Sequence, residues 1–225
     1  WFGGPWVPRT PLPRPWSKPT GILAGLVFAG AWIASSLTLL ALAWTALAWL
    51  WIRVFHQPGQ GRRRLLLLAF LSFPWLVLEW PQLGWWLRLS SAAVAEAIFL
   101  LLQMPVVRDG TQIVITGVPV NIEAACAGWN LLQLSLFVGL VIGIYEIPRS
   151  SRFALFLALV PLLAWTANLV RILILSGVAL TFDISLADGA LHGLTGLLAV
   201  LVVVIASRLL SALISPPTHS APSAP

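Results

Sequence analysis

Three polar residues inside otherwise apolar segments have the side-chain types needed for thiol chemistry: Cys126, Arg171 and His192. A cysteine at a helix N-terminus is a stronger nucleophile, because backbone N–H groups and a nearby cation stabilise its thiolate. An arginine stabilises the oxyanion that forms in acyl transfer, and a histidine moves protons. Because an arginine at the membrane centre costs roughly 3 kcal/mol, we expect it to face the bundle interior. The set indicates nucleophilic acyl transfer.

The neighbours of the cysteine suit an accessible thiol. Cys126 lies in the segment Glu123-Ala-Ala-Cys126-Ala-Gly128-Trp-Asn130. Small flanking residues expose the sulfur and allow close helix packing. These neighbours are equally compatible with a cysteine that has no catalytic role, since a lone cysteine is commonly a small buried hydrophobic residue.

The arginine and the histidine each have a possible partner on their own helix. Asn168 precedes Arg171 by about one turn and therefore shares its face. Asp188 precedes His192 by four residues and is suited to fix the imidazole tautomer. The alternatives are an arginine that reaches the headgroups or pairs with Glu123, and a histidine that merely lies at the interface.

Composition makes the chain an integral membrane protein. Of its 225 residues 59% are apolar and 9% are charged, against about 25% charged in soluble domains. The mean hydropathy is +0.94. The net charge of +6 comes from bases at the ends of apolar segments, where the positive-inside rule explains them better than nucleic-acid binding does. A single cysteine excludes an intramolecular disulfide, and no metal-ligand spacing or cofactor motif is present.

Hydropathy and turn residues predict an all-α multi-span bundle of the cell (inner or plasma) membrane. The segment 1–20 is Pro-rich, and residues 215–225 form a Pro/Ser tail that we expect to be disordered. We predict an interfacial helix over 83–104 and a small extracytoplasmic β-hairpin within 106–122, pairing Gln112–Thr116 with Val118–Ile122. The single membrane domain, 21–214, is expected to have five spans: 21–52, 65–80, 124–145, 153–182 and 190–214.

Arginine-rich loops orient these spans. Four arginines lie between residues 53 and 64, and two more follow Pro148. Both loops are predicted to be cytoplasmic. This topology brings Cys126, Arg171 and His192 to a similar depth near the extracytoplasmic face.

The ordered set of a Cys, then Asn-x-x-Arg, then His with trailing glycines resembles the exosortase/archaeosortase family of membrane cysteine transpeptidases. The resemblance runs from about Leu65 to Leu210 and includes Pro74 and the segment Pro105-Val-Val-Arg-Asp-Gly110. It departs from the family at Ala127, because Cys-Ser-Gly is common there and this chain has Cys126-Ala127-Gly128.

The resemblance implies a membrane-embedded peptidase that cleaves a C-terminal sorting signal and transfers or releases the product. Such a signal has a short motif, one transmembrane helix and a basic tail. Cys126 would be the nucleophile, Arg171 the electrostatic stabiliser and His192 the proton-transfer partner, with Asn168, Asp188, Glu123, Gly128 and Asn130 supporting them. The expected partners are a membrane-anchored protein substrate and the lipid bilayer. Acceptor and oligomeric state are left open.

Other functions fit the residues less well. A non-catalytic membrane scaffold on the same fold is the main alternative. A transporter would need intramembrane acidic residues, and a thiol oxidoreductase a second thiol. A serine intramembrane protease would need a Ser/His pair, and neither Ser135 nor Ser176 has a glycine-rich setting.

Overall fold

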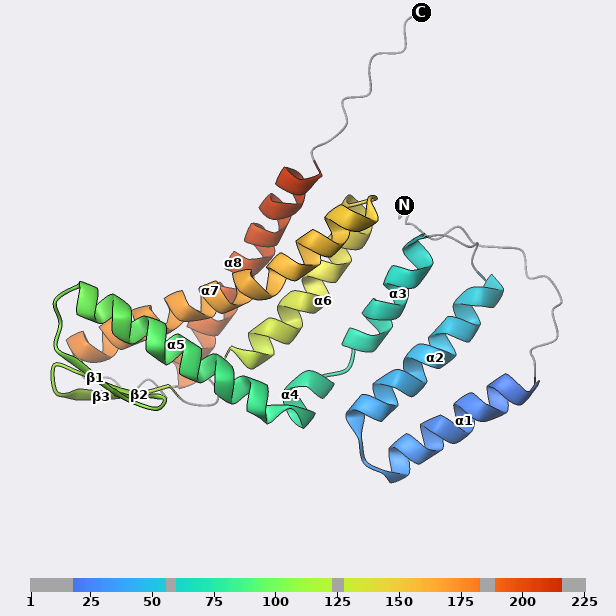
Figure 1. Ribbon diagram of the computed structural model, residues 1–225, viewed down its shortest axis with the longest axis horizontal. Coiled ribbons are helices and arrows are strands. Elements are labelled where there is room, and N and C mark those ends of the chain that lie inside the picture. Colours follow the sequence, from blue (N-terminus) through green and yellow to red (C-terminus); the bar gives the residue numbers. More distant parts are fainter. Residues whose placement is uncertain (1–17, 56–59, 123–127, 183–188, 216–225) are drawn as a thin grey trace, which may run out of the picture.

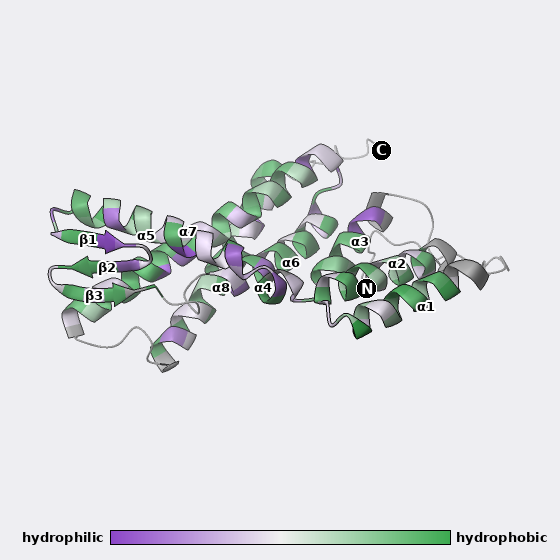
Figure 2. Ribbon diagram, turned by 60° about the horizontal axis from the view of Figure 1, so that its bottom comes forward, coloured by the Kyte–Doolittle hydropathy of each residue, from purple (hydrophilic) through white to green (hydrophobic). Residues whose placement is uncertain are grey.

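The protein is a bundle of helices with a small antiparallel sheet at one end (Figure 1). The computed structural model describes residues 18–55, 60–122, 128–182 and 189–215. Four of the described helices are long and apolar enough to cross a membrane: Pro81–Leu101, Trp129–Glu146, Ser150–Thr181 and Leu191–Ile214. Figure 2 shows hydrophobic residues on most faces of the long helices. The chain is therefore an all-α multi-pass membrane protein.

The first apolar segment is two helices, α1 (Lys18–Ile33) and α2 (Leu37–Phe55), where one tilted helix over 21–52 was expected. Between them Ser35 takes a positive φ of 52°. The carboxylate of Glu79 then caps α2, because it accepts hydrogen bonds from the backbone N–H groups of Leu37 and Thr38. Hydropathy could not reveal this break, since the capping residue lies more than 40 positions away.

The second predicted span, 65–80, is also divided, into α3 (Gln60–Leu71) and α4 (Trp75–Glu79). Pro74 lies in the break, where a proline removes a helical donor. The side-chain amide of Gln133 donates to the carbonyl of Phe73, which satisfies one acceptor released by the break. The expected kink at Pro74 is thus a complete interruption.

Next come α5 (Pro81–Leu101) and the strands β1 (Val106–Asp109), β2 (Gln112–Ile115) and β3 (Val118–Asn121). The predicted hairpin is present as β2 and β3, and β1 extends it to three strands in the order β1-β2-β3. Arg108 of β1 pairs with Glu96 of α5 at 2.7 Å. The helix α5 runs across the direction of the other helices (Figure 1). By length and composition it is also one of the four candidate spans, so its interfacial position stays a prediction.

The remaining helices are α6 (Trp129–Glu146), α7 (Ser150–Phe182) and α8 (Gly189–Ile214). They correspond to the last three predicted spans, except that α6 begins at Trp129 and not at the predicted residue 124. Gly139 and Gly143 let α6 and α7 approach closely, because a Cβ at either position would come within 3.0 Å of Val160 or Phe153. At the end of α6 that precedes Arg149 and Arg152, Glu146 pairs with Arg208 of α8.

Three hydrophobic clusters of buried residues form the core of the described residues, and the two larger ones lie toward opposite ends of α7. One joins α5, the sheet and the later turns of α7, through residues such as Phe99, Ile113 and Leu175. The other joins the end of α6 to the start of α7, around Leu140 and Phe156. At 33 residues α7 is longer than the roughly 20 needed to cross a bilayer, so its final turns reach the sheet.

Candidate functional site

The candidate site begins at Gly128, the residue before α6. Its φ of 71° is left-handed, a conformation that L residues adopt at a cost. A Cβ there would lie 2.5 Å from Cγ of Asn168. Backbone conformation and space therefore both require glycine, and the start of α6 is held directly against α7.

Asn168 and Arg171 lie one turn apart on α7 and are both buried, with exposed fractions of 2% and 8%. At 1.5 Å per residue, Arg171 is about 30 Å along the helix from Ser150. That distance matches the thickness of a hydrocarbon core of roughly 30 Å. The guanidinium is thus shielded by protein and lies about one hydrocarbon thickness along α7 from Ser150.

The guanidinium is held by the first turns of α8. Its Nη2 lies 2.9 Å from Nε2 of His192 and donates to the backbone oxygen of His192 at 3.1 Å. Its Nε donates to Oγ1 of Thr195 at 3.2 Å. These bonds aim a fixed positive charge at the pocket and offset its desolvation.

The contact between the two side chains defines the state of the imidazole. Arginine remains protonated in proteins and has no acceptor, so Nη2 of Arg171 must be the donor. Nε2 of His192 therefore carries a lone pair, and the ring proton is on Nδ1. In this arrangement the lone pair of Nε2 accepts a hydrogen bond from Arg171, so His192 can take up a proton there only after the guanidinium has moved away.

A pocket of about 260 Å³ lies between these elements. Arg171 and His192 line it together with Gly128 and Asn130 at the start of α6. The structure thus brings together four of the residues selected from the sequence, and Asn168 supports them through its contact with Gly128. Cys126, Glu123 and Asp188 lie outside the described residues.

Thr195 is a site residue that the sequence reasoning missed. It lies three residues after His192, on the same face of α8, and a hydroxyl at that spacing was an available signal. Gly196 was noticed only as a trailing glycine. A Cβ there would lie 3.7 Å from Nη2 of Arg171, so this residue is part of the wall beside the guanidinium.

A metal site is not formed by the described part of the chain. In residues 18–55, 60–122, 128–182 and 189–215 no three His, Cys, Asp or Glu side chains gather closely enough to hold an ion. The chemistry that the described residues offer is proton transfer at His192 and charge stabilisation at Arg171.

Comparison with known proteins gives one family. A family model described as transmembrane exosortase matches residues 5–207, which include every described element up to most of α8. No curated protein and no solved structure matches the chain.

Proposed function

The chain belongs to the transmembrane exosortase family, and from this premise we propose that it is a cysteine transpeptidase acting on the C-terminal sorting signals of exported proteins. The observation that carries the proposal is the contact of 2.9 Å between Arg171 and His192 in a pocket beside Gly128. A histidine and a fixed cation thereby line one pocket with Gly128, and Gly128 follows the only cysteine in the sequence by two residues.

Cys126 is the proposed nucleophile. Only Ala127 separates it from Gly128, whose position against Asn168 is sterically defined. The N-terminus of α6 begins at Trp129, three residues after Cys126, and the positive end of its helix dipole together with Arg171 favours a thiolate over a thiol.

The proposed reaction has two halves. The substrate carbonyl draws Arg171 toward its oxygen, which frees Nε2 of His192 to take the thiol proton from Cys126. The sulfur forms a bond to the carbonyl carbon, and the guanidinium stabilises the resulting oxyanion. The tetrahedral intermediate collapses, the C–N bond breaks, and imidazolium donates its proton to the leaving amine.

A thioester on Cys126 then remains. The acceptor, which is water, an amine or a hydroxyl, attacks the thioester and gives its proton to His192. When the C–S bond breaks, the departing sulfur recovers that proton, so the enzyme returns to its starting state.

The substrate helix is proposed to lie between α7 and α8. A groove of about 360 Å³ runs there, lined largely by apolar and small residues. Arg171 and Ala199 line both this groove and the pocket. A helix in the groove would therefore deliver the peptide that precedes it directly to the guanidinium, and small wall residues permit close helix packing.

Reconstituted protein should cleave a fusion substrate that carries a candidate motif, a transmembrane helix and a basic tail. Cys126→Ala should abolish cleavage, whereas a matched Ala125→Ser change should not. Continued cleavage by the Cys126→Ala protein would refute the proposed chemistry.

The groove is tested separately. Val202 and Leu201 are similarly exposed, at 55% and 53%, but only Val202 lines the groove. Val202→Trp should raise KM for the full substrate and leave a short motif peptide unaffected, while Leu201→Trp should change neither. Equal effects of the two substitutions would argue against this helix position without affecting the proposed chemistry.

A further inference from the structure

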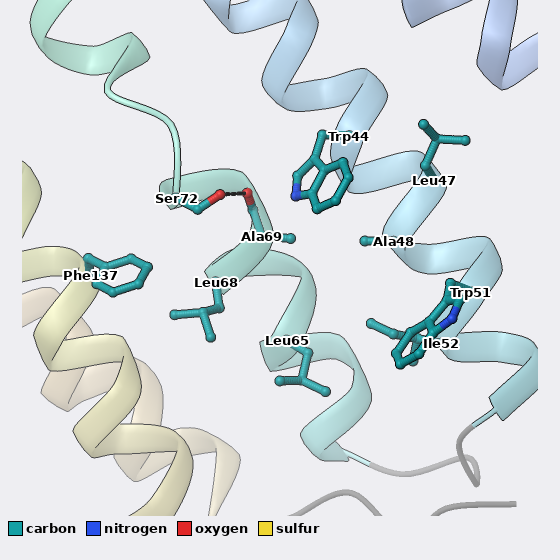
Figure 3. A pocket seen from close by; sticks show the side chains of 10 residues that line it. All are labelled: Trp44, Leu47, Ala48, Trp51, Ile52, Leu65, Leu68, Ala69, Ser72 and Phe137. Carbon is teal, nitrogen blue, oxygen red and sulfur yellow. Dashed lines mark hydrogen bonds between the residues drawn. The ribbon is translucent and has the colours of Figure 1, made fainter.

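A second and larger groove lies between α2 and α3. It measures about 860 Å³, within the roughly 300–1,000 Å³ typical of ligand pockets. Figure 3 shows Trp44 and Trp51 of α2 on one wall, Leu65 of α3 facing them, and Phe137 of α6 beyond α3. This groove shares no lining residue with the candidate site.

The interior of the groove is suited to hydrocarbon. Its lining is apolar apart from the tryptophan N–H groups and one hydroxyl, that of Ser72. That hydroxyl donates to the carbonyl of Ala69 at 2.6 Å (Figure 3). The hydroxyl is therefore satisfied within α3, and the groove favours an apolar occupant.

One end of the groove is marked by positive charge. Ile52 of α2 lines the groove and is followed in the sequence by Arg53. Leu65 of α3 also lines it and is preceded by three consecutive arginines. Of these, Arg64 turns inward: it donates to the carbonyls of Ile147 and Pro148, and its guanidinium lies 4.0 Å from the ring centre of Phe153. Arg63, in contrast, is exposed.

This combination selects the class of occupant. An acyl chain fills an irregular space between large tryptophan rings, whereas a helix of about 10 Å diameter needs a continuous face of small residues. A substrate's basic tail would meet like charge at the arginine-rich end. A lipid phosphate meets opposite charge there, because Arg53 lies in the last turn of α2 and three arginines lie in the first turns of α3.

We propose that the groove between α2 and α3 is a binding site for an anionic glycerophospholipid. One acyl chain lies between Trp44, Trp51 and Leu65, and the phosphate is held by the exposed Arg63 at the start of α3. The bound lipid fills the space between α2 and α3 and so fastens the α1–α2 hairpin to the bundle. This site is independent of the proposed peptidase activity.

Native mass spectrometry of the delipidated full chain tests the proposal. The protein is titrated with phosphatidylglycerol and, separately, with phosphatidylcholine carrying the same acyl chains. We expect one tightly retained phosphatidylglycerol and no comparable retention of phosphatidylcholine. Arg63→Gln should weaken the binding of phosphatidylglycerol about fivefold, which is the effect of one arginine near an anionic headgroup. The matched control is Arg149→Gln, since Arg149 is also exposed but belongs to the loop between α6 and α7 and not to α2 or α3.

The groove itself is tested by filling it. Ala48→Trp places an indole in the groove and should abolish retention, whereas Ala158→Trp, at an exposed position of α7 outside it, should not. Thermal unfolding of each variant checks that it is folded. If the Ala48→Trp protein does not fold, Arg63→Gln still tests the proposal. Equal retention of the two lipids, or retention unaffected by Arg63→Gln, would identify only annular lipid. A co-purified protein helix that lipid cannot displace would also overturn the proposal.

Discussion

Replacing Gly128 with alanine is the sharpest structural test of the candidate site. The added Cβ meets two obstacles: the left-handed φ of 71°, and the side chain of Asn168 at 2.5 Å. The backbone conformation costs about 1–2 kcal/mol for an L residue. Overpacking in a tight core adds about 1–3 kcal/mol. We therefore expect Gly128→Ala to lower the free energy of unfolding by about 3 kcal/mol.

The Gly110→Ala variant separates the cost of the backbone conformation from the cost of overpacking. Gly110 also has a left-handed φ, of 60°, but nothing lies within 4 Å of a Cβ built there. Gly110→Ala should therefore cost only the backbone term, about 1 kcal/mol. SDS titration of both proteins from mixed micelles measures the difference.

A double substitution then assigns the overlap to Asn168. Asn168→Ala removes Cγ and Nδ2, the two nearest atoms, and leaves Cβ at 2.9 Å. Gly128→Ala combined with Asn168→Ala should be less destabilising than the sum of the single changes, by about 1 kcal/mol for contacting residues. Strict additivity, or equal effects of Gly128→Ala and Gly110→Ala, would refute the close contact between α6 and α7.

Three further predictions concern the arginines and their partners. Arg171→Gln should lower kcat by about 10²–10³, the usual effect of losing an oxyanion stabiliser, and Arg171→Lys should not restore it because a lysine lacks the planar fork. Thr195→Val removes one hydrogen bond to the guanidinium. It should lower kcat about tenfold, which corresponds to roughly 1.5 kcal/mol, and leave KM little changed. An unchanged kcat would mean that this bond does not position Arg171. Arg64→Ala removes two charge-assisted bonds to the carbonyls of Ile147 and Pro148, directly after α6. It should lower the free energy of unfolding in SDS titration by about 3 kcal/mol, whereas the exposed Arg149→Ala should lower it by under about 0.5 kcal/mol. Similar losses in the two variants would contradict an anchoring role for Arg64.

Hydropathy was sufficient for the membrane class and for the later helices, because long apolar runs have few alternatives to spanning. It was insufficient for the first half of the bundle. The apolar run 21–52 carries no charge, yet the cap from Glu79 allows it to turn at Ser35. Similarly, Pro74 signals a disturbance between α3 and α4, but its extension to a full break is accommodated by Gln133, a residue of α6, which donates to the carbonyl of Phe73. Such tertiary satisfaction of backbone groups leaves no local pattern.

For the site, expensive polar residues in apolar helices were a reliable guide. Arg171 and His192 were selected because lipid would not tolerate them unpaired, and they contact each other. Thr195 was missed because a hydroxyl in a transmembrane helix can bond its own backbone at little cost, as it also does here to Leu191. The tautomer of His192 likewise required a neighbour on another helix.

The most direct test of the central claim is the detection of an acyl-enzyme on Cys126. Reconstituted protein is incubated with a sorting-signal substrate, quenched in acid and analysed by intact mass spectrometry and peptide mapping. We predict an adduct with the mass of the substrate's N-terminal fragment on Cys126, released by hydroxylamine, accumulating in the absence of acceptor and absent from Cys126→Ala. Substrate cleavage without any such adduct, and equally fast in Cys126→Ala, would contradict the account.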